Sequence, residues 1–166
     1  RLEKHVALNH LGGRVTVVPG AVVDQAGPVR FLVHPSTSMG KAVGSAGREK
    51  MEAYLKEIEV PGLALDGYAF EQGQTPPQAI KMDIEGGEVL AIKGMQRILA
   101  ELHPLLLVEL HGHEAAHAVW ETLARHGYTV HRMQSGYPQV ASVDQLDWKA
   151  YIVGRPTINL LKNSIF

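Results

Sequence analysis

The second half of the chain alternates short apolar runs with longer segments of helical periodicity, and this alternation constrains the fold more than any other feature. Residues 105–108 are apolar at every position, as in a strand buried on both faces of a sheet. Residues 88–102 and 114–126 instead repeat apolar side chains every three or four positions, which predicts amphipathic helices. Buried strands that alternate with helices predict an α/β domain with a mostly parallel sheet.

The remaining elements are predicted from local composition. Two strands, 128–133 and 150–153, have no helix between them, so we expect an antiparallel pair at one edge of the sheet. A further strand precedes the first of these helices, at 79–84. For the first half we predict a helix at 1–11, a strand at 15–18, a hairpin of 21–23 with 29–33, a loop at 34–47, a strand at 54–60, and a helix starting within 61–70. A second long loop is predicted at 134–147.

Composition is typical of one globular domain spanning residues 1–166. The chain has 166 residues, of which 45% are hydrophobic, and this is enough to bury a core of its own. The net charge of −1 does not suggest a nucleic-acid-binding protein, and no apolar run reaches the roughly 18 residues of a membrane span. Cysteine is absent, which excludes thiol nucleophiles and thiolate metal sites. No leader is visible after Arg1, and we expect a cytoplasmic protein without nucleic-acid or membrane partners.

Charged residues gather where two predicted strands end. Alternate side chains of a strand share a face, so Asp83 and Glu85 point to the same side. Glu109 and His111 follow the next buried strand with the same spacing. Because ligands of parallel sheets bind beyond the carboxyl ends of the strands, we expect these four side chains to form one rim of a site.

The segments around this rim resemble a known family. Residues 81–88 read KMDIEGGE, residues 89–94 read VLAIKG, and residues 103–111 read HPLLLVELH. This order resembles the FkbM family of S-adenosylmethionine-dependent methyltransferases, whose members carry segments similar to IKIDVEGAE, VLKGA and P-x-hydrophobic-E. Residues 2–9, 15–24 with Gly27, and Leu65-Asp66 also resemble family segments. The resemblance covers essentially the whole chain and corresponds to the C-terminal two thirds of a family member.

The resemblance implies a fold, a cofactor and a reaction. The implied fold is a Rossmann-like class I methyltransferase sheet, mostly parallel with an antiparallel C-terminal edge pair, and lacking the first two strands. The implied reaction is transfer of a methyl group from S-adenosylmethionine to a hydroxyl of a small molecule or sugar. Gly20, Ala21 and Asp83 are the implied cofactor-binding residues. The family's main glycine-rich cofactor motif is not found in this sequence, so the chain alone is expected to have an incomplete pocket and to be inactive if truncated.

Methyl transfer requires in-line approach of an oxygen nucleophile, and a general base can remove its proton. The candidate catalytic residues are therefore Asp83, Glu85 and His111, with Asp83 nearest the methyl donor. Glu109 and His34 are the candidate substrate-binding residues. Each has a structural alternative: Asp83 can cap the following helix, Glu109 can pair with a lysine, Lys81, across the strands, and the histidines can be solvated.

A second motif competes with this interpretation. Residues 113–117 read HEAAH, which matches the H-E-x-x-H pattern of zinc metalloproteases. We assign no metal site to it, because Trp120 stands where the extended motif has glycine and because both histidines flank an ordinary apolar stripe. The alternative functions are a non-catalytic remnant or interaction module of the same fold, and a metal-dependent hydrolase that uses His113, Glu114 and His117.

The strands expected to be missing have a consequence for the sheet. In the family's sheet the first strand lies beside the fourth, and the second strand lies between the first and the third. Without them, the strand at 79–84 would present an open edge, which is a site for pairing with another chain. We therefore expect a gap or rearranged pairing between 15–18 and 79–84, or a homodimer formed through this edge.

Overall fold

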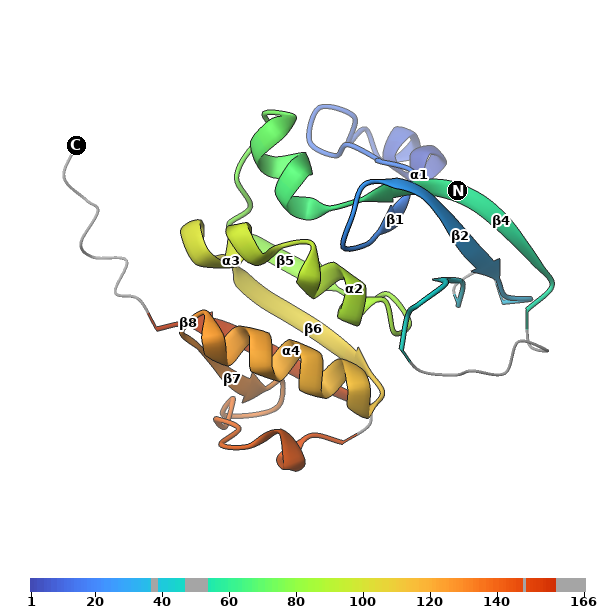
Figure 1. Ribbon diagram of the computed structural model, residues 1–166. Helices are drawn as coiled ribbons and strands as arrows, with labels where there is room; N and C mark the ends of the chain where they lie inside the picture. Colours follow the sequence, from blue (N-terminus) through green and yellow to red (C-terminus); the bar gives the residue numbers. More distant parts are fainter. Residues whose placement is uncertain (37–38, 47–53, 148, 158–166) are drawn as a thin grey trace, which may run out of the picture.

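Two four-stranded sheets form the framework of the chain (Figure 1), as the computed structural model shows for residues 1–36, 39–46, 54–147 and 149–157. In spatial order, the strands of the first sheet are β1 (Ala21–Val22), β4 (Lys56–Leu63), β2 (Gly27–Val33) and β3 (Lys41–Ala42). Those of the second sheet are β5 (Ala79–Met82), β6 (Leu105–His111), β8 (Lys149–Pro156) and β7 (Tyr128–Arg132). The predicted α/β class is confirmed.

The prediction of one mostly parallel sheet is wrong for the part of the chain that the structure describes, where two mixed sheets are found. The parallel pairs there are β1 with β4 and β5 with β6, and the other four pairs are antiparallel. The reason is that β2 folds back along β4, and β8 runs antiparallel to both of its neighbours. The predicted antiparallel pair at the C-terminal edge is confirmed in β7 and β8.

The first sheet differs from its predicted hairpin. β2 pairs with β4 from Gly27↔Gly62 to Val33↔Lys56, whereas β1 runs parallel to β4 on its other side. Gly62 permits this close arrangement, because a Cβ there would lie 2.5 Å from a Val29 methyl carbon. The predicted loop at 34–47 contains β3, while residues 37–38 and 47 of that prediction lie outside the described residues.

Helices cover the second sheet and enclose the main core. α4 (His113–Arg125) packs beside α2 (Glu88–Lys93), as Figure 1 shows, and both contribute to one apolar cluster with β6 and β8. Ile92, Leu106 and Leu123 are fully buried in this cluster. Burial of one such side chain contributes about 1.5–3 kcal/mol. The core therefore holds β5 and β6, and the residues that follow them, in fixed positions.

The helix predicted at 88–102 is divided into α2 and α3 (Gln96–Glu101). At Gly94 the backbone lies so close to the carbonyl oxygen of Val23 that a Cβ would overlap it. The carboxylate of Asp66 then caps the start of α3, because it accepts hydrogen bonds from the amides of Arg97 (2.9 Å) and Ile98 (2.8 Å). Both contacts are long-range, which is why helical periodicity alone missed the break.

The N-terminal segment packs little against the rest. α1 (Leu2–Leu8) buries no residue, and the predicted strand at 15–18 is wrong, since these residues are largely exposed and in no strand. Within the described residues, β1 and β5 are edge strands of separate sheets and do not pair with each other. The expected gap in strand pairing is therefore present, but it lies between β1 and β5, whereas residues 15–18 were expected on its first side.

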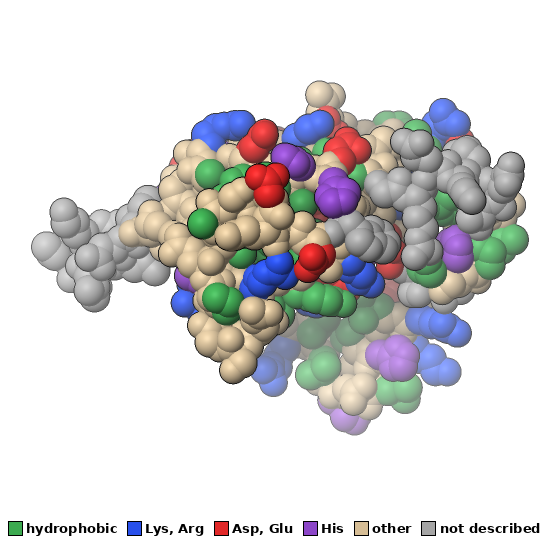
Figure 2. All heavy atoms as spheres, turned by 90° about the horizontal axis from the view of Figure 1, so that it is seen from below, with side chains coloured by type: hydrophobic (Ala, Val, Ile, Leu, Met, Phe, Trp, Pro, Cys, Tyr) green, Lys and Arg blue, Asp and Glu red, His purple; other side chains and the backbone are tan. Residues whose placement is uncertain are grey.

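Shorter elements complete the described chain: a π-helical turn at Gly67–Glu71 and a 3₁₀ turn at Val143–Gln145, which lies within the loop predicted at 134–147. The face seen in Figure 2 carries acidic and basic side chains interspersed with histidines. Among the described residues, no helix is both long and apolar enough to cross a membrane.

Candidate active site

A strained turn joins β5 to α2. Glu85 and Gly86 both have left-handed backbone angles, with φ of 52° and 96°. A glycine is required at the second position, since a Cβ on Gly86 would overlap the carbonyl oxygen of Ala46. In turn, the Ala46 amide donates a 2.8 Å hydrogen bond to the Gly86 carbonyl. This contact fixes the segment after β3 against the turn after β5.

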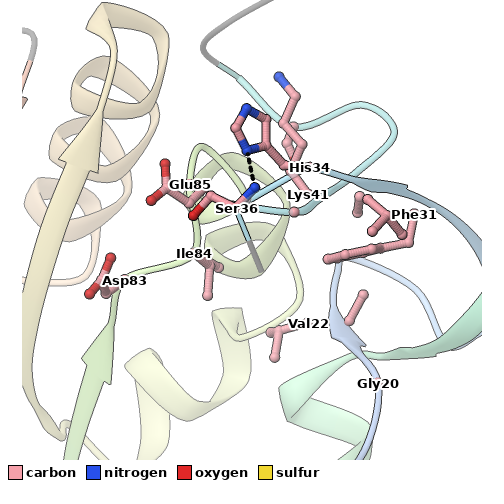
Figure 3. A pocket seen from close by; sticks show the side chains of 15 residues that line it. Gly20, Val22, Phe31, His34, Ser36, Lys41, Asp83, Ile84 and Glu85 are labelled. Atoms are coloured by element: carbon pink, nitrogen blue, oxygen red, sulfur yellow. Dashed lines mark hydrogen bonds between the residues drawn. The ribbon is translucent and has the colours of Figure 1, made fainter. Parts of the chain in front are cut away.

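A cavity of about 340 Å³ lies between the first sheet and this turn (Figure 3). Five of the predicted site residues line it: Gly20, Ala21, His34, Asp83 and Glu85. Apolar side chains form part of the wall, among them Val22, Phe31 and Ile84. The cavity therefore brings the predicted cofactor residues after 15–18 together with the carboxylates after β5.

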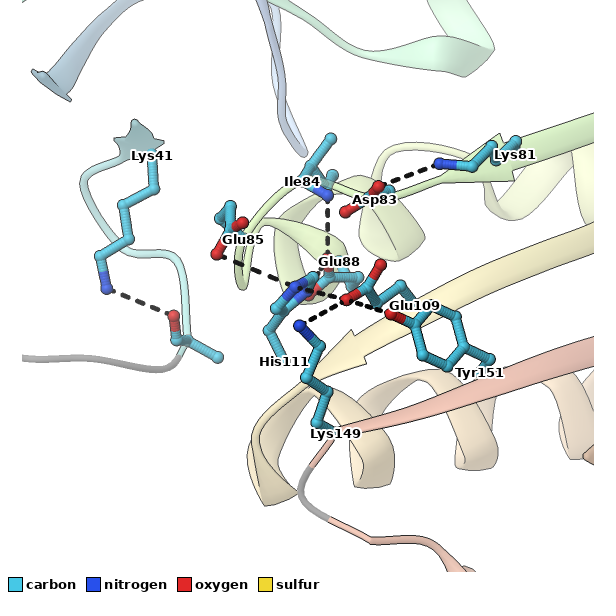
Figure 4. A network of polar contacts seen from close by, with 11 residues as sticks. Lys41, Lys81, Asp83, Ile84, Glu85, Glu88, Glu109, His111, Lys149 and Tyr151 are labelled. Carbon is cyan, nitrogen blue, oxygen red and sulfur yellow. Dashed lines mark hydrogen bonds and ion pairs between the residues drawn. The ribbon is translucent and has the colours of Figure 1, made fainter. Parts of the chain in front are cut away.

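The other two predicted rim residues, Glu109 and His111, lie beside this cavity and do not line it. The Nδ1 atom of His111 lies 3.1 Å from Oε1 of Glu88, which also accepts the amide of Ile84 at 3.2 Å (Figure 4). Glu88 is 0% exposed and His111 is 7% exposed. A carboxylate acceptor at Nδ1 holds the proton there and leaves Nε2 directed towards the carboxylates of Glu85 and Glu109.

Lysines neutralise two carboxylates of the rim. Asp83 forms a 3.0 Å ion pair with Lys81, and Glu109 forms a 2.9 Å ion pair with Lys149. The hydrogen bond to Glu109 raises the pKa of the Lys149 ammonium, and it raises the pKa of the Tyr151 hydroxyl, which donates to Glu109 at 3.0 Å. The structural alternative of a pair between Glu109 and Lys81 is therefore wrong.

The alternative role of Asp83 as a helix cap is also wrong, because its carboxylate accepts a hydrogen bond from the Lys81 ammonium and none from an amide of α2 among the described residues. His34 accepts a 3.1 Å hydrogen bond from the Ser36 amide at Nδ1, and its ring meets that of Tyr54 edge-on. His34 thus lines the cavity in an orientation fixed by local contacts.

Sequence reasoning missed several polar residues of the site. Glu88, Lys149 and Tyr151 belong to the rim, while Lys41 and Ser45 line the cavity. Glu88 was visible only as an acidic residue in the first turn of a helix, where negative charge is ordinarily stabilised by the helix dipole. Lys149 and Tyr151 could have been found from their alternation in β8, since they share a face of that strand.

The competing histidine motif lies elsewhere on the surface. His113, Glu114 and His117 are exposed on the first turns of α4. Among the described residues, the group of possible metal ligands whose donor atoms lie within 4.8 Å of one another comprises Asp83, Glu109 and His111, without His113 or His117.

The chain thus combines mixed α/β sheets with a cavity flanked by carboxylates at the end of a parallel strand, which is where ligands of α/β sheets are generally found. Residues 1–130 match the model of the methyltransferase FkbM domain, and the chain belongs to this family. The match ends in β7, so it is shorter than the expected coverage of essentially the whole chain. No curated protein and no solved structure matched the chain.

Proposed function

We propose that the chain acts as an S-adenosylmethionine-dependent O-methyltransferase on a hydroxyl of a small molecule or sugar. The observation that carries the proposal is the cavity, which has Gly20 and Ala21 on one side and Asp83 and Glu85 on the other, in a member of the FkbM methyltransferase family. Ligand cavities of enzymes typically combine such an apolar wall with a few convergent polar groups.

The lining of the cavity suits the chemistry of parts of the cofactor. Its apolar residues, which include Val22 and Phe31, offer a surface for a flat adenine ring, and its carboxylates complement a positively charged sulfonium. When bound, S-adenosylmethionine supplies an activated methyl group to an acceptor oxygen. The protein's own contribution is to bind both reactants, align them and exclude water.

Within this proposal the predicted residues have distinct roles. Asp83 faces the methyl donor, and Glu85 accepts the proton of the acceptor hydroxyl. Glu85 is favoured over His111 as the base because it lines the cavity, whereas His111 does not. The left-handed backbone of Glu85 supports this role, since such strain is concentrated at functional sites. His34, which lines the cavity, contacts the acceptor, whereas the predicted substrate-binding role of Glu109 stays a prediction because this residue does not line the cavity.

The experiment is a methyl-transfer assay with isotopically labelled S-adenosylmethionine and a pool of sugars and alcohols. We expect labelled methyl ether and S-adenosylhomocysteine to form together. Glu85→Gln is expected to lower the rate about 10²–10⁴-fold, the usual contribution of a general base. The matched control is Glu121→Gln on the exposed face of α4, which is expected to leave the rate unchanged.

Two results would contradict the proposal. Cofactor binding without turnover on any hydroxyl compound would favour a non-catalytic module of this fold. Transfer that is equally fast in Glu85→Gln and the wild type would remove Glu85 from the mechanism.

A further inference from the structure

Three side chains beside the cavity offer one nitrogen and two carboxylates to a common point. The donor atoms of Asp83, Glu109 and His111 all lie within 4.8 Å of one another. Glu109 and His111 point to the same side of β6, and Asp83 follows the neighbouring parallel strand β5 (Figure 4). Glu109 and His111 are thus placed by strand β6 itself, and Asp83 occupies the first position after β5.

The imidazole of His111 is oriented for a ligand at Nε2. This atom is buried and has no hydrogen-bond partner among the described residues. Its nearest neighbours are carboxylate oxygens, Oε1 of Glu109 at 3.5 Å and Oε2 of Glu85 at 3.8 Å. A lone pair that faces two carboxylates is repelled by them unless a positive charge lies between.

The local charge balance leads to the same conclusion. The four carboxylates around His111 belong to Asp83, Glu85, Glu88 and Glu109. The ammonium groups of Lys81 and Lys149 offset two of these charges. With a neutral imidazole, two negative charges remain, and one divalent cation would bring the group to zero.

We propose that Asp83, Glu109 and His111 bind a divalent first-row transition-metal ion. A mixed set of carboxylates and imidazole suits ions such as Mn²⁺ and Zn²⁺. Glu88 acts as the positioning residue, because metal-binding histidines usually donate their other ring N–H to a carboxylate or carbonyl. The proposal concerns ion binding and is independent of methyl transfer.

The lysines do not obstruct such an ion. Lys81 contacts Oδ2 of Asp83 and Lys149 contacts Oε1 of Glu109, so that each carboxylate has a second oxygen to offer. The two lysine side chains are 69% and 47% exposed.

The test uses Mn²⁺ alone and follows the paramagnetic resonance signal of the free ion while the 166-residue chain is added. We expect the signal to fall as one ion binds to each chain. Asp83→Asn, which alters a partly exposed side chain, is expected to weaken binding at least tenfold, and Glu88→Gln about 10–100-fold. The matched control is the double variant His113→Gln/His117→Gln, which removes two exposed histidines and is expected to bind like the wild type.

Three results would overturn the proposal. The free Mn²⁺ signal could remain unchanged with the wild-type chain. Asp83→Asn could bind as tightly as the wild type. Binding could be lost in the double variant of α4, which would assign the ion to the exposed histidine motif.

Discussion

The buried carboxylate of Glu88 determines how His111 is presented to the rim. It accepts both the Ile84 amide and the His111 ring, and so connects the turn after β5 to the end of β6. A carboxylate without a partner costs several kcal/mol when it is buried. Both contacts are made by Oε1 and offset part of that cost, while Oε2 is buried without a hydrogen-bond partner among the described residues. The orientation of one imidazole is therefore coupled to the turn that lines the cavity.

Tyr128 illustrates how burial at the residue scale controls ionisation. Its side chain is 6% exposed, and its hydroxyl donates a 3.1 Å hydrogen bond to the Pro104 carbonyl. Burial raises the pKa of Tyr128 from 10.0 to about 12. Between these two values the unfolded chain loses the tyrosine proton before the folded chain does. The contribution of Tyr128 to the free energy of unfolding is thus fully present below pH 10 and decreases as the pH rises from 10 towards 12.

The measurement is a spectrophotometric titration of phenolate formation, combined with denaturant unfolding at each pH. Tyr128→Phe is expected to abolish the last ionisation step and to flatten this part of the stability profile. Tyr137→Phe, at a 47% exposed position, serves as the control and is expected to leave the step assigned to Tyr128 in place. If Tyr128→Phe and Tyr137→Phe remove the same step, the assigned burial effect is wrong.

At the scale of elements, the turn from β5 to α2 depends on one glycine. Gly86→Ala places a methyl group against the Ala46 carbonyl and adds the strain of a left-handed backbone, which costs about 1–2 kcal/mol by itself. We expect the free energy of unfolding to fall by more than this amount, together with loss of the cavity wall.

Denaturant unfolding of Gly73→Ala isolates the strain, because Gly73 has a φ of 65° but no atom within 4 Å of an added Cβ. Gly86→Ala should therefore be clearly more destabilising than Gly73→Ala. Equal losses of stability in the two variants would show that the contact with Ala46 contributes nothing.

Elements set by local periodicity were predicted well, while those set by distant contacts were not. β6 and α4 followed from continuous apolar residues and from helical spacing. The break between α2 and α3 did not, because it depends on Val23 and Asp66, which are remote in sequence. The same distinction applies to the site: Asp83 and Glu85 were found from strand alternation, whereas the contact of Glu88 with His111 joins residues 23 positions apart.

At the scale of the whole molecule, the two sheets meet at the cavity. The first sheet supplies Ala21 and His34, and the second supplies the turn that contains Asp83 and Glu85. β5 is paired on one side only among the described residues, and the homodimer expected through this edge stays a prediction. The proposed methyl transfer requires that the cavity between the sheets is the cofactor site.

The most direct test is to map S-adenosylhomocysteine binding by amide chemical shifts in the isotopically labelled chain. We predict that the largest shifts occur at residues 20–22, 40–42 and 83–85, which line the cavity. Shifts confined to residues 113–117 of α4, or no shift at any cavity residue at high ligand concentration, would contradict the proposed methyl-donor site.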